Sequence, residues 1–388
     1  YGLDERGRIY FSSEMKSIAD QCKSFSTFPP GHYYTAKTGF VKYYHPEYED
    51  HKNANQPLDL ELIRESLIKA TSKRLLANVP LGVVMSGGLD TSLISAITSR
   101  LLKENRQKLH SFSIGHDADA PDNMAARKAA AFLGTEHHEI HFTVEEGVKV
   151  LEKVIYHIET YDIISVRSGV PMYLLSKAIA DQGIKVILSG EGADEIFGGH
   201  LYFRNAPSEE EFQDETIERV QKLFTADLLR ADKTTMANGL EVRIPFLDTE
   251  FLDVAIRIKT QEKQPKNYDG VEKYILRKAF DTPENPYLPA EVLWRQKEQF
   301  SDGVGYKWVD ELIEYCSSQV TDEQLAGANA EFPYNSPTTK EAYLYRSIFH
   351  KYYPQVSAAQ TVRKWIPKWQ ENLDPSGRAN AAHLKGNF

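Results

Sequence analysis

One seven-residue segment limits what this chain can fold into more than any other feature. It reads Ser-Gly-Gly-Leu-Asp-Thr-Ser over residues 86–92, and it joins an apolar run, Leu81 to Met85, to a helical pattern that begins at Ser92. A buried strand, a glycine turn and a helix in this order place the unpaired N–H groups of the helix N-terminus at the turn. The segment therefore predicts an anion-binding loop in an α/β domain.

The residue types in this loop suit a polyphosphate. Gly87 and Gly88 have no Cβ, so backbone N–H groups can close on phosphate oxygens. Further donors come from three hydroxyls, those of Ser86, Thr91 and Ser92. Asp90 cannot bind phosphate itself, and a carboxylate beside a polyphosphate is best explained as an Mg²⁺ ligand. The alternative is a glycine turn without a ligand, but chance gives such a string with a probability on the order of 10⁻⁴ or less.

Short apolar runs alternate with helical patterns after this loop. Strands are expected at Leu81 to Met85, Leu109 to Ile114, His138 to Phe142 and Lys185 to Leu188. Helices are expected at Ser92 to Lys103, Asp122 to Leu133, Val144 to Glu159 and Pro171 to Ala180, and mostly helical sequence is expected after the last of these strands to about Val320. This rhythm predicts a doubly wound parallel sheet of the α/β class, with a helical C-terminal part.

A second loop with glycines and acids follows the strand that ends at Leu188. It reads Ser-Gly-Glu-Gly-Ala-Asp-Glu over residues 189–195. Parallel sheets bind ligands at their carboxyl edge, so the two loops are expected to face each other. Asp194 is then a second Mg²⁺ ligand beside Asp90, and Glu191 is the candidate general base. The alternative is that the acids form only a solvated first helical turn.

The two ends of the chain differ from its middle. Residues 1–45 predict a small β unit, in which Lys37-Thr38-Gly39 forms a hairpin turn. Residues 46–57 are polar and contain prolines, as in a linker, and an amphipathic helix is expected from Leu58 to about Leu76. The main domain is expected over residues 58–356, and residues 357–388 are expected to loosen into a tail.

Composition excludes several classes of function. The formal charge of -9 leaves no basic surplus for a nucleic-acid backbone. No apolar run approaches the roughly 18 residues that a membrane span needs. The two cysteines, Cys22 and Cys316, are far apart, which is typical of a reducing compartment and predicts a cytoplasmic protein.

The phosphate loop resembles that of the ATP pyrophosphatase family, and longer motifs narrow the resemblance to the glutamine-hydrolysing asparagine synthetases over nearly the whole chain. The motifs are Val79-Pro80-Leu81-Gly82-Val83, Tyr156-His157-Ile158-Glu159-Thr160-Tyr161-Asp162, Ser189 to Gly199 with Tyr202-Phe203, Arg243-Ile244-Pro245-Phe246-Leu247-Asp248, and Trp-Arg-Gln-Lys-Glu-Gln-Phe-Ser-Asp-Gly-Val-Gly over residues 294–305. The resemblance implies an adenine-nucleotide alpha-hydrolase-like sheet. It also implies that an enzyme of this kind activates aspartate with ATP as β-aspartyl-AMP, releases AMP and pyrophosphate, and forms asparagine.

The resemblance also assigns site residues and partners. Backbone around the positions matching Val84, Ile114, Ser189 and Gly190 holds AMP in that family. Lys297 matches a lysine that contacts the phosphates, and Lys233 matches a second lysine of the pocket. Residues 1–45 resemble the last strands of a glutaminase domain, whose amino-terminal cysteine nucleophile is absent from this sequence. Ammonia is therefore the expected nitrogen donor here, and a homodimer is compatible with the sequence.

Three alternatives stand beside this interpretation. A β-lactam-type synthetase shares the phosphate loop, although the Arg-Gln-Lys-Glu-Gln-Phe-Ser-Asp string argues against it. A non-catalytic nucleotide-binding module could keep the fold, but Asp90, Asp194, Glu191 and Lys297 are all intact. His137, Glu139 and His141 alternate on one strand with His138 beside them and suggest zinc, but a polar alternation of this kind is more typical of an edge strand.

Overall fold

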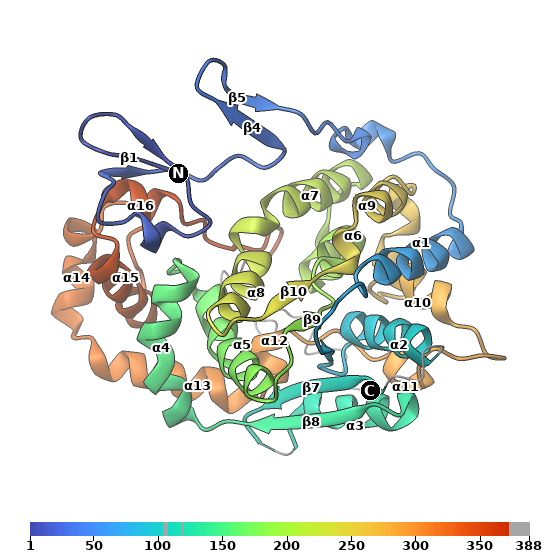
Figure 1. The fold of residues 1–388 in the computed structure, drawn as a ribbon. Helices are drawn as coiled ribbons and strands as arrows, with labels where there is room; N and C mark the ends of the chain where they lie inside the picture. Colours follow the sequence, from blue (N-terminus) through green and yellow to red (C-terminus); the bar gives the residue numbers. More distant parts are fainter. Residues whose placement is uncertain (104–107, 118, 372–388) are drawn as a thin grey trace.

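A five-stranded parallel sheet forms the centre of the molecule (Figure 1). The computed structural model describes residues 1–103, 108–117 and 119–371. The strand order is β10-β9-β6-β7-β8. The strands are β6 (Leu81–Val84), β7 (His110–Gly115), β8 (Glu136–His141), β9 (Val186–Leu188) and β10 (Glu241–Arg243). The predicted parallel sheet is confirmed, and β8 is an edge strand as its polar alternation indicated.

Helices cover both faces of the sheet, which confirms the doubly wound architecture. A hydrophobic core lies on each face. Successive side chains of β6 point to opposite faces, so Val83 packs in the first core and Val84 in the second. The first core draws on α1 (Leu60–Lys73), α2 (Leu89–Lys103), α3 (Pro121–Leu133), α6 (Ala193–Phe197), α9 (Thr249–Ile256), α10 (Tyr274–Phe280) and α11 (Ala290–Leu293). The second draws on α4 (Val144–Ile158), α5 (Ile163–Asp181), α13 (Tyr306–Gln319), α15 (Lys340–Tyr352) and α16 (Val356–Gln360).

Four further helices complete the body. They are α7 (Glu209–Lys222), α8 (Asp227–Met236), α12 (Phe300–Gly303) and α14 (Asp322–Glu331). No helix within the described ranges is both long and apolar enough to cross a membrane.

The strand order reverses at the centre of the sheet. From β6 the chain adds β7 and β8 on one side, and it then returns to add β9 and β10 on the other. The loops that follow β6 and β9 diverge at this switch point and leave a crevice at the carboxyl edge. The two predicted loops are the ones that border it.

Helix α5 begins eight residues earlier than Pro171, the predicted start, and carries this proline in its interior. A proline inside a helix has no N–H for the carbonyl four residues earlier. That carbonyl belongs to Arg167, and it accepts a hydrogen bond from the indole Nε1–H of Trp308 at 2.9 Å. The tertiary contact replaces the missing helical bond, which is why the sequence pattern alone placed the helix start wrongly.

The N-terminal region has the predicted β structure, but its Ile18, Cys22 and Phe25 pack into the second core of the body. It contains a three-stranded sheet, β1 (Gly2–Leu3), β2 (Ile9–Tyr10) and β3 (Ser24–Phe25), and a hairpin of β4 (His32–Thr35) and β5 (Gly39–Lys42). Short 3-10 turns at Glu47–Glu49 and His51–Asn53 then lead to α1. The boundaries of the expected domains stay predictions.

The segment from residue 357 to 371 does not form the loose tail that its composition suggested. Ala358 and Ala359 of α16 are buried, and the hydroxyl of Tyr161 donates to the carbonyl of Ala359 at 3.0 Å. The N–H of Trp365 donates to Asp162 at 2.8 Å. Residues 372–388 lie outside the described part of the chain.

Two helical glycines test how tightly the second core is packed. A Cβ on Gly147 of α4 would lie 2.4 Å from Cζ3 of the fully buried Trp308, whereas Gly327 of α14 has nothing within 4 Å. We expect Gly147→Ala to lower the free energy of unfolding by about 1–3 kcal/mol through overpacking. Gly327→Ala, the matched control, should raise it by about 0.5–1 kcal/mol. Urea denaturation measures both, and an unchanged or raised stability in Gly147→Ala would contradict the packing described here.

Candidate active site

A cavity lies at the carboxyl edge of the sheet, between the loops that follow β6 and β9. Most of the residues that the sequence selected line it, namely Val84, Ser86, Gly88, Asp90, Thr91, Ser189, Gly190, Glu191, Asp194 and Lys297. The prediction that the two loops face each other is therefore confirmed.

The two loops approach each other through glycine. A Cβ on Gly190 would lie 2.6 Å from both the carbonyl carbon of Asp90 and the N of Thr91, so the backbones touch where any side chain would separate them. Gly87 has φ +74°, and a Cβ there would meet the N of Ala126 in α3 at 2.4 Å. The glycines are thus required by close packing between elements as well as by the turn.

Lys273 lies between the two acids that the sequence proposed as metal ligands. Its Nζ donates to Asp90 at 2.7 and 2.9 Å and to Asp194 at 2.7 Å. Lys297 donates to the other oxygen of Asp194 at 2.5 Å. The side chain of Lys273 is 1% exposed. Sequence analysis missed this residue, because nothing in its local pattern distinguishes it from a surface lysine.

Burial and neighbouring charges set the protonation of this cluster. Burial raises the pKa of Asp90; the charge of Asp194 raises it further, and Lys273 only partly opposes this. Burial also disfavours the charged form of Asp194, but Lys273 and Lys297 outweigh it and hold the pKa well below its usual value. The two aspartates raise the pKa of Lys297 against its own burial, so its ammonium keeps its charge.

Glu191 has a different environment from these aspartates. Its nearest cation is Arg230, with Nη2 at 3.3 Å. Burial first, and then the charges of Asp227 and Glu195, raise the pKa of Glu191 to about 7. A carboxylate with this pKa can accept a proton near neutral pH, which is the property that a general base needs.

The acids after Glu191 are not a solvated helix start. Asp194 and Glu195 occupy the first turn of α6, where their charge suits the helix dipole. The side chain of Asp194 is 13% exposed and that of Glu195 only 4%. Both face the interior of the site, so the alternative interpretation of this loop is wrong.

Glu272 positions both lysines. It forms an ion pair with Arg277, and it accepts the backbone N–H of Lys297 at 2.9 Å. Arg277 also donates to the carbonyl of Leu293 at 2.6 Å. The start of α10 and the segment before α12 are held together in this way, so Lys273 and Lys297 reach the same pair of aspartates.

The structure corrects the expected place of Lys233. This lysine is 7% exposed and forms an ion pair with Glu159, which also accepts the backbone N–H groups of Met15 and Lys16 at 3.0 and 2.8 Å. Lys233 lines a different cavity, one between the N-terminal unit and α8. The resemblance placed Lys233 in the synthetase pocket, but this lysine does not line the cavity between the two loops, and its catalytic role stays a prediction.

Three other predicted residues do not line the cavity. Gly87 packs against α3, as described above. Ile114 is 2% exposed and belongs to the second hydrophobic core. Ser92 is fully buried in α2. These residues shape the strand and helix that carry the loop.

His137, Glu139 and His141 of β8 do not form a metal site; each contacts other side chains. His137 lies 3.0 Å from the hydroxyl of Ser111. Arg127 donates to both oxygens of Glu139 at 2.6 Å, and His141 lies 3.0 Å from the same carboxylate. Within the described residues these three side chains do not converge on one point.

This chain is similar to known proteins of one family. The family model described as Asparagine synthase matches residues 62–213 and 204–374. The chain is 48% identical over 400 residues to "Asparagine synthetase, root [glutamine-hydrolyzing]" of Pisum sativum, covering 98% of this chain and 68% of that protein. It is 49% identical to "Probable asparagine synthetase [glutamine-hydrolyzing]" of Dictyostelium discoideum over 99% of this chain and 72% of that protein. A solved NAD+ synthetase from Burkholderia pseudomallei matches with a TM-score of 0.30 and 13% identity over 61% of this chain and 94% of that one, too low to add to the assignment.

The environment of Glu191 makes stability depend on pH. The usual pKa of 4.5 is raised to about 7, so between these values the folded state holds a proton that the unfolded state has released. The free energy of unfolding therefore falls as pH rises through this window, and Glu191→Gln removes that loss. We therefore expect the free energy of unfolding of Glu191→Gln, measured relative to that of the unmodified chain, to rise by about 1–3 kcal/mol between pH 5 and pH 8.

Urea denaturation at the two pH values measures this difference. Glu65→Gln, which changes an exposed carboxylate on α1, is the matched control and should follow the unmodified chain. If the stability of Glu191→Gln followed the unmodified chain as well, Glu191 would not have the raised pKa described here.

Proposed function

The chain belongs to the asparagine synthase family, which makes it a ligase that forms asparagine, and from this premise we propose the course of its reaction. The side-chain carboxylate of aspartate attacks the α-phosphorus of ATP, and pyrophosphate leaves. Ammonia then attacks the β-aspartyl-AMP, and AMP leaves as the amide forms. The observation that carries this proposal is the contact of Lys273 with Asp90 and Asp194 between two glycine loops.

The phosphate loop and the two lysines serve the first step. The N–H groups at the start of α2 and the hydroxyls of Ser86 and Thr91 point to the triphosphate as their ligand. Lys297 offers a cation that reaches the open part of the cavity, because its side chain is 21% exposed while that of Lys273 is almost fully buried. We assign Lys297 to the charge that develops on the transferring phosphorus.

The charge balance of the cluster supports a magnesium requirement. The two aspartates and the two lysines cancel one another, so the protein alone supplies no surplus positive charge for a triphosphate. Carboxylate oxygens are the ligands that Mg²⁺ prefers, and Asp90 and Asp194 fit that chemistry. Held by these residues, Mg²⁺ would supply positive charge that offsets the repulsion between the carboxylates and the phosphates.

Glu191 serves the second step. Ammonia that attacks the acyl-adenylate gains a positive charge on its nitrogen, and this proton must leave before the amide is complete. A pKa of about 7 lets Glu191 be ionised and accept that proton in neutral solution. Arg230, 3.3 Å away, keeps the carboxylate oriented toward the cavity that both share.

The nitrogen donor provides the direct test of this function. Cys22 and Cys316 are 2% and 0% exposed, and burial raises the pKa of both thiols, that of Cys316 to about 12. Neither can act as the thiolate that attacks glutamine. We expect the 388-residue chain to form asparagine from aspartate, ATP and ammonium chloride, faster as pH rises, and to form none above background with glutamine.

Amino-acid analysis and AMP release measure the products. A panel of other amino-acid substrates, run in parallel, separates this function from a β-lactam-type synthetase. AMP formation with a different acid would replace aspartate as the substrate, and no AMP with any of them would favour a non-catalytic module. Synthesis with glutamine would overturn the conclusion drawn from the two thiols.

Lys297 and Lys233 both match pocket lysines of the family, but their alanine variants should differ in ATP/pyrophosphate exchange. Lys297→Ala removes a cation from the cavity, and we expect the rate of ATP/pyrophosphate exchange to fall at least about 100-fold. Lys233→Ala should change that rate by only a few-fold, because Lys233 lines another cavity. It should instead lower the free energy of unfolding by about 1–3 kcal/mol, since the buried Glu159 then keeps, among the described residues, only Lys16 as a cationic partner. Equal losses of exchange in the two variants, measured at a temperature where both are folded, would contradict the placement of Lys233.

A further inference from the structure

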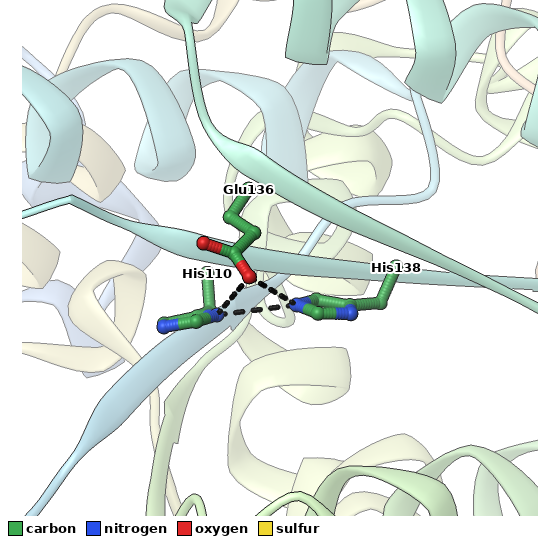
Figure 2. Close-up of side chains that lie close together, drawn as sticks. All are labelled: His110, Glu136 and His138. Carbon is green, nitrogen blue, oxygen red and sulfur yellow. Dashed lines mark hydrogen bonds and ion pairs between the residues drawn. The ribbon is translucent and has the colours of Figure 1, made fainter.

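At the opposite edge of the sheet from the nucleotide cavity, we propose that His110, Glu136 and His138 bind a divalent transition-metal ion of the zinc class. Figure 2 shows the three side chains converging from two neighbouring strands. None of them belongs to the proposed active site, and this inference stands apart from the proposed reaction.

The strand register brings the three residues together. His110 lies opposite Glu136 in the parallel pair of β7 and β8, and Phe112 lies opposite His138. Residues two apart in a strand point to the same face, so all three side chains leave the sheet on one side. The ring of His138 stacks on Phe112 with centroids 4.8 Å apart, which limits its rotation.

The distances are close to those of a metal site. Nδ1 of His110 lies 3.1 Å from Nε2 of His138, and Oε1 of Glu136 lies 4.0 Å from each nitrogen. Ligand atoms around a tetrahedral Zn²⁺ lie about 3.3–3.4 Å apart, given bond lengths of about 2.0–2.1 Å. The nitrogens need to separate by a few tenths of an ångström, and the carboxylate needs to approach by about 0.6 Å.

Glu136 is free to make that movement. Its side chain is 46% exposed, and its nearest cation is Lys108, whose ammonium lies 3.4 Å away and which is 64% exposed. An exposed ion pair of this kind contributes little and is readily exchanged. The His110–His138 contact is a hydrogen bond at present, and coordination would replace it with two bonds to one cation.

The donor set identifies the class of metal. Two imidazoles and one carboxylate suit Zn²⁺, and also Co²⁺, Ni²⁺ and Cu²⁺, while Mg²⁺ and Ca²⁺ prefer oxygen ligands. Three protein ligands leave a fourth position for water. The site lies on partly exposed side chains, so an ion can reach it from solvent.

Two other clusters in the described part of the chain are weaker candidates. His51, Glu210 and Asp214 offer a single imidazole with two exposed carboxylates, and His51 is already paired with Asp214 at 2.8 Å. Glu195, His200 and Asp227 line the nucleotide cavity and belong to the site described above. Among these clusters only the one at His110 has two imidazoles.

The location indicates what a bound ion would do. His110 and Glu136 are the first residues of their strands, whereas the phosphate loop follows the last residue of β6. At about 3.3 Å per residue, these six-residue strands separate the two edges by roughly 15 Å. The ion would link the edge strand β8 to β7 and stabilise that side of the sheet without contacting ATP.

Zinc binding to the purified 388-residue chain tests the proposal, with Co²⁺ absorption as a report on the ligands. We expect one Zn²⁺ per chain with an imidazole-coordinated Co²⁺ spectrum, and a rise of the melting temperature on adding Zn²⁺. His110→Ala and His138→Ala should each weaken binding at least about 100-fold, because even a change behind a ligand costs 10–100-fold. Glu136→Gln, which keeps the side-chain shape, should weaken it by at least about tenfold.

Two matched variants distinguish this site from the others. His141→Ala removes a histidine of the same strand, and His51→Ala removes the imidazole of the second cluster. Both should bind Zn²⁺ as the unmodified chain does. ATP/pyrophosphate exchange should be unchanged in all five variants, which shows that they are folded. Unchanged zinc affinity in His110→Ala and His138→Ala, loss of binding in His51→Ala, or no zinc binding by the unmodified chain would each overturn the proposal.

Discussion

The contact of Lys273 with Asp90 and Asp194 is the interaction on which the architecture of the site depends. Two ionised carboxylates repel each other in a buried crevice unless a cation lies between them, and removal of that cation would leave an uncompensated buried charge. Lys273 reaches this place because α10 is held by the ion pair of Arg277 with Glu272, and Glu272 also fixes the backbone of Lys297. One acid thus aligns two cations with two anions.

The strand order of the sheet creates the crevice, and Gly190 allows the two loops to touch across it. Because the strand order reverses beside β6, the loops after β6 and β9 border one crevice at the carboxyl edge of the sheet. Gly190 then allows the second loop to touch the backbone of Asp90 and Thr91. Close approach excludes water between the loops, and a low local dielectric strengthens each charge that faces the cavity. The raised pKa of Glu191 comes from the same exclusion of solvent.

The buried carboxylate of Glu159 joins the N-terminal unit to the body. Glu159 has a left-handed backbone with φ 56°, which ends α4 and turns its carboxylate toward residues 15 and 16 and toward Lys233. Glu159 lies within a sequence motif that resembles the family, and Lys233 matches a lysine of that family. Motif resemblance therefore marked residues that matter to this structure in two ways, some at the nucleotide cavity and some at the junction between two parts of the chain.

The sequence by itself determined the parallel sheet, the two glycine loops and the acids Asp90, Glu191 and Asp194, because these follow from the spacing of apolar residues and from turns, which depend on near neighbours in the chain. It did not determine that Lys273 belongs to the site, which cavity Lys233 lines, where α5 begins or that residues 241–243 form the strand β10. Lys273 meets Asp90 across 183 residues and Asp194 across 79, and Pro171 is tolerated in α5 only because Trp308 donates to Arg167. An isolated lysine or proline has the same local pattern on a surface as in a core. Only the tertiary structure decides which partner it meets, because that partner comes from a distant part of the chain.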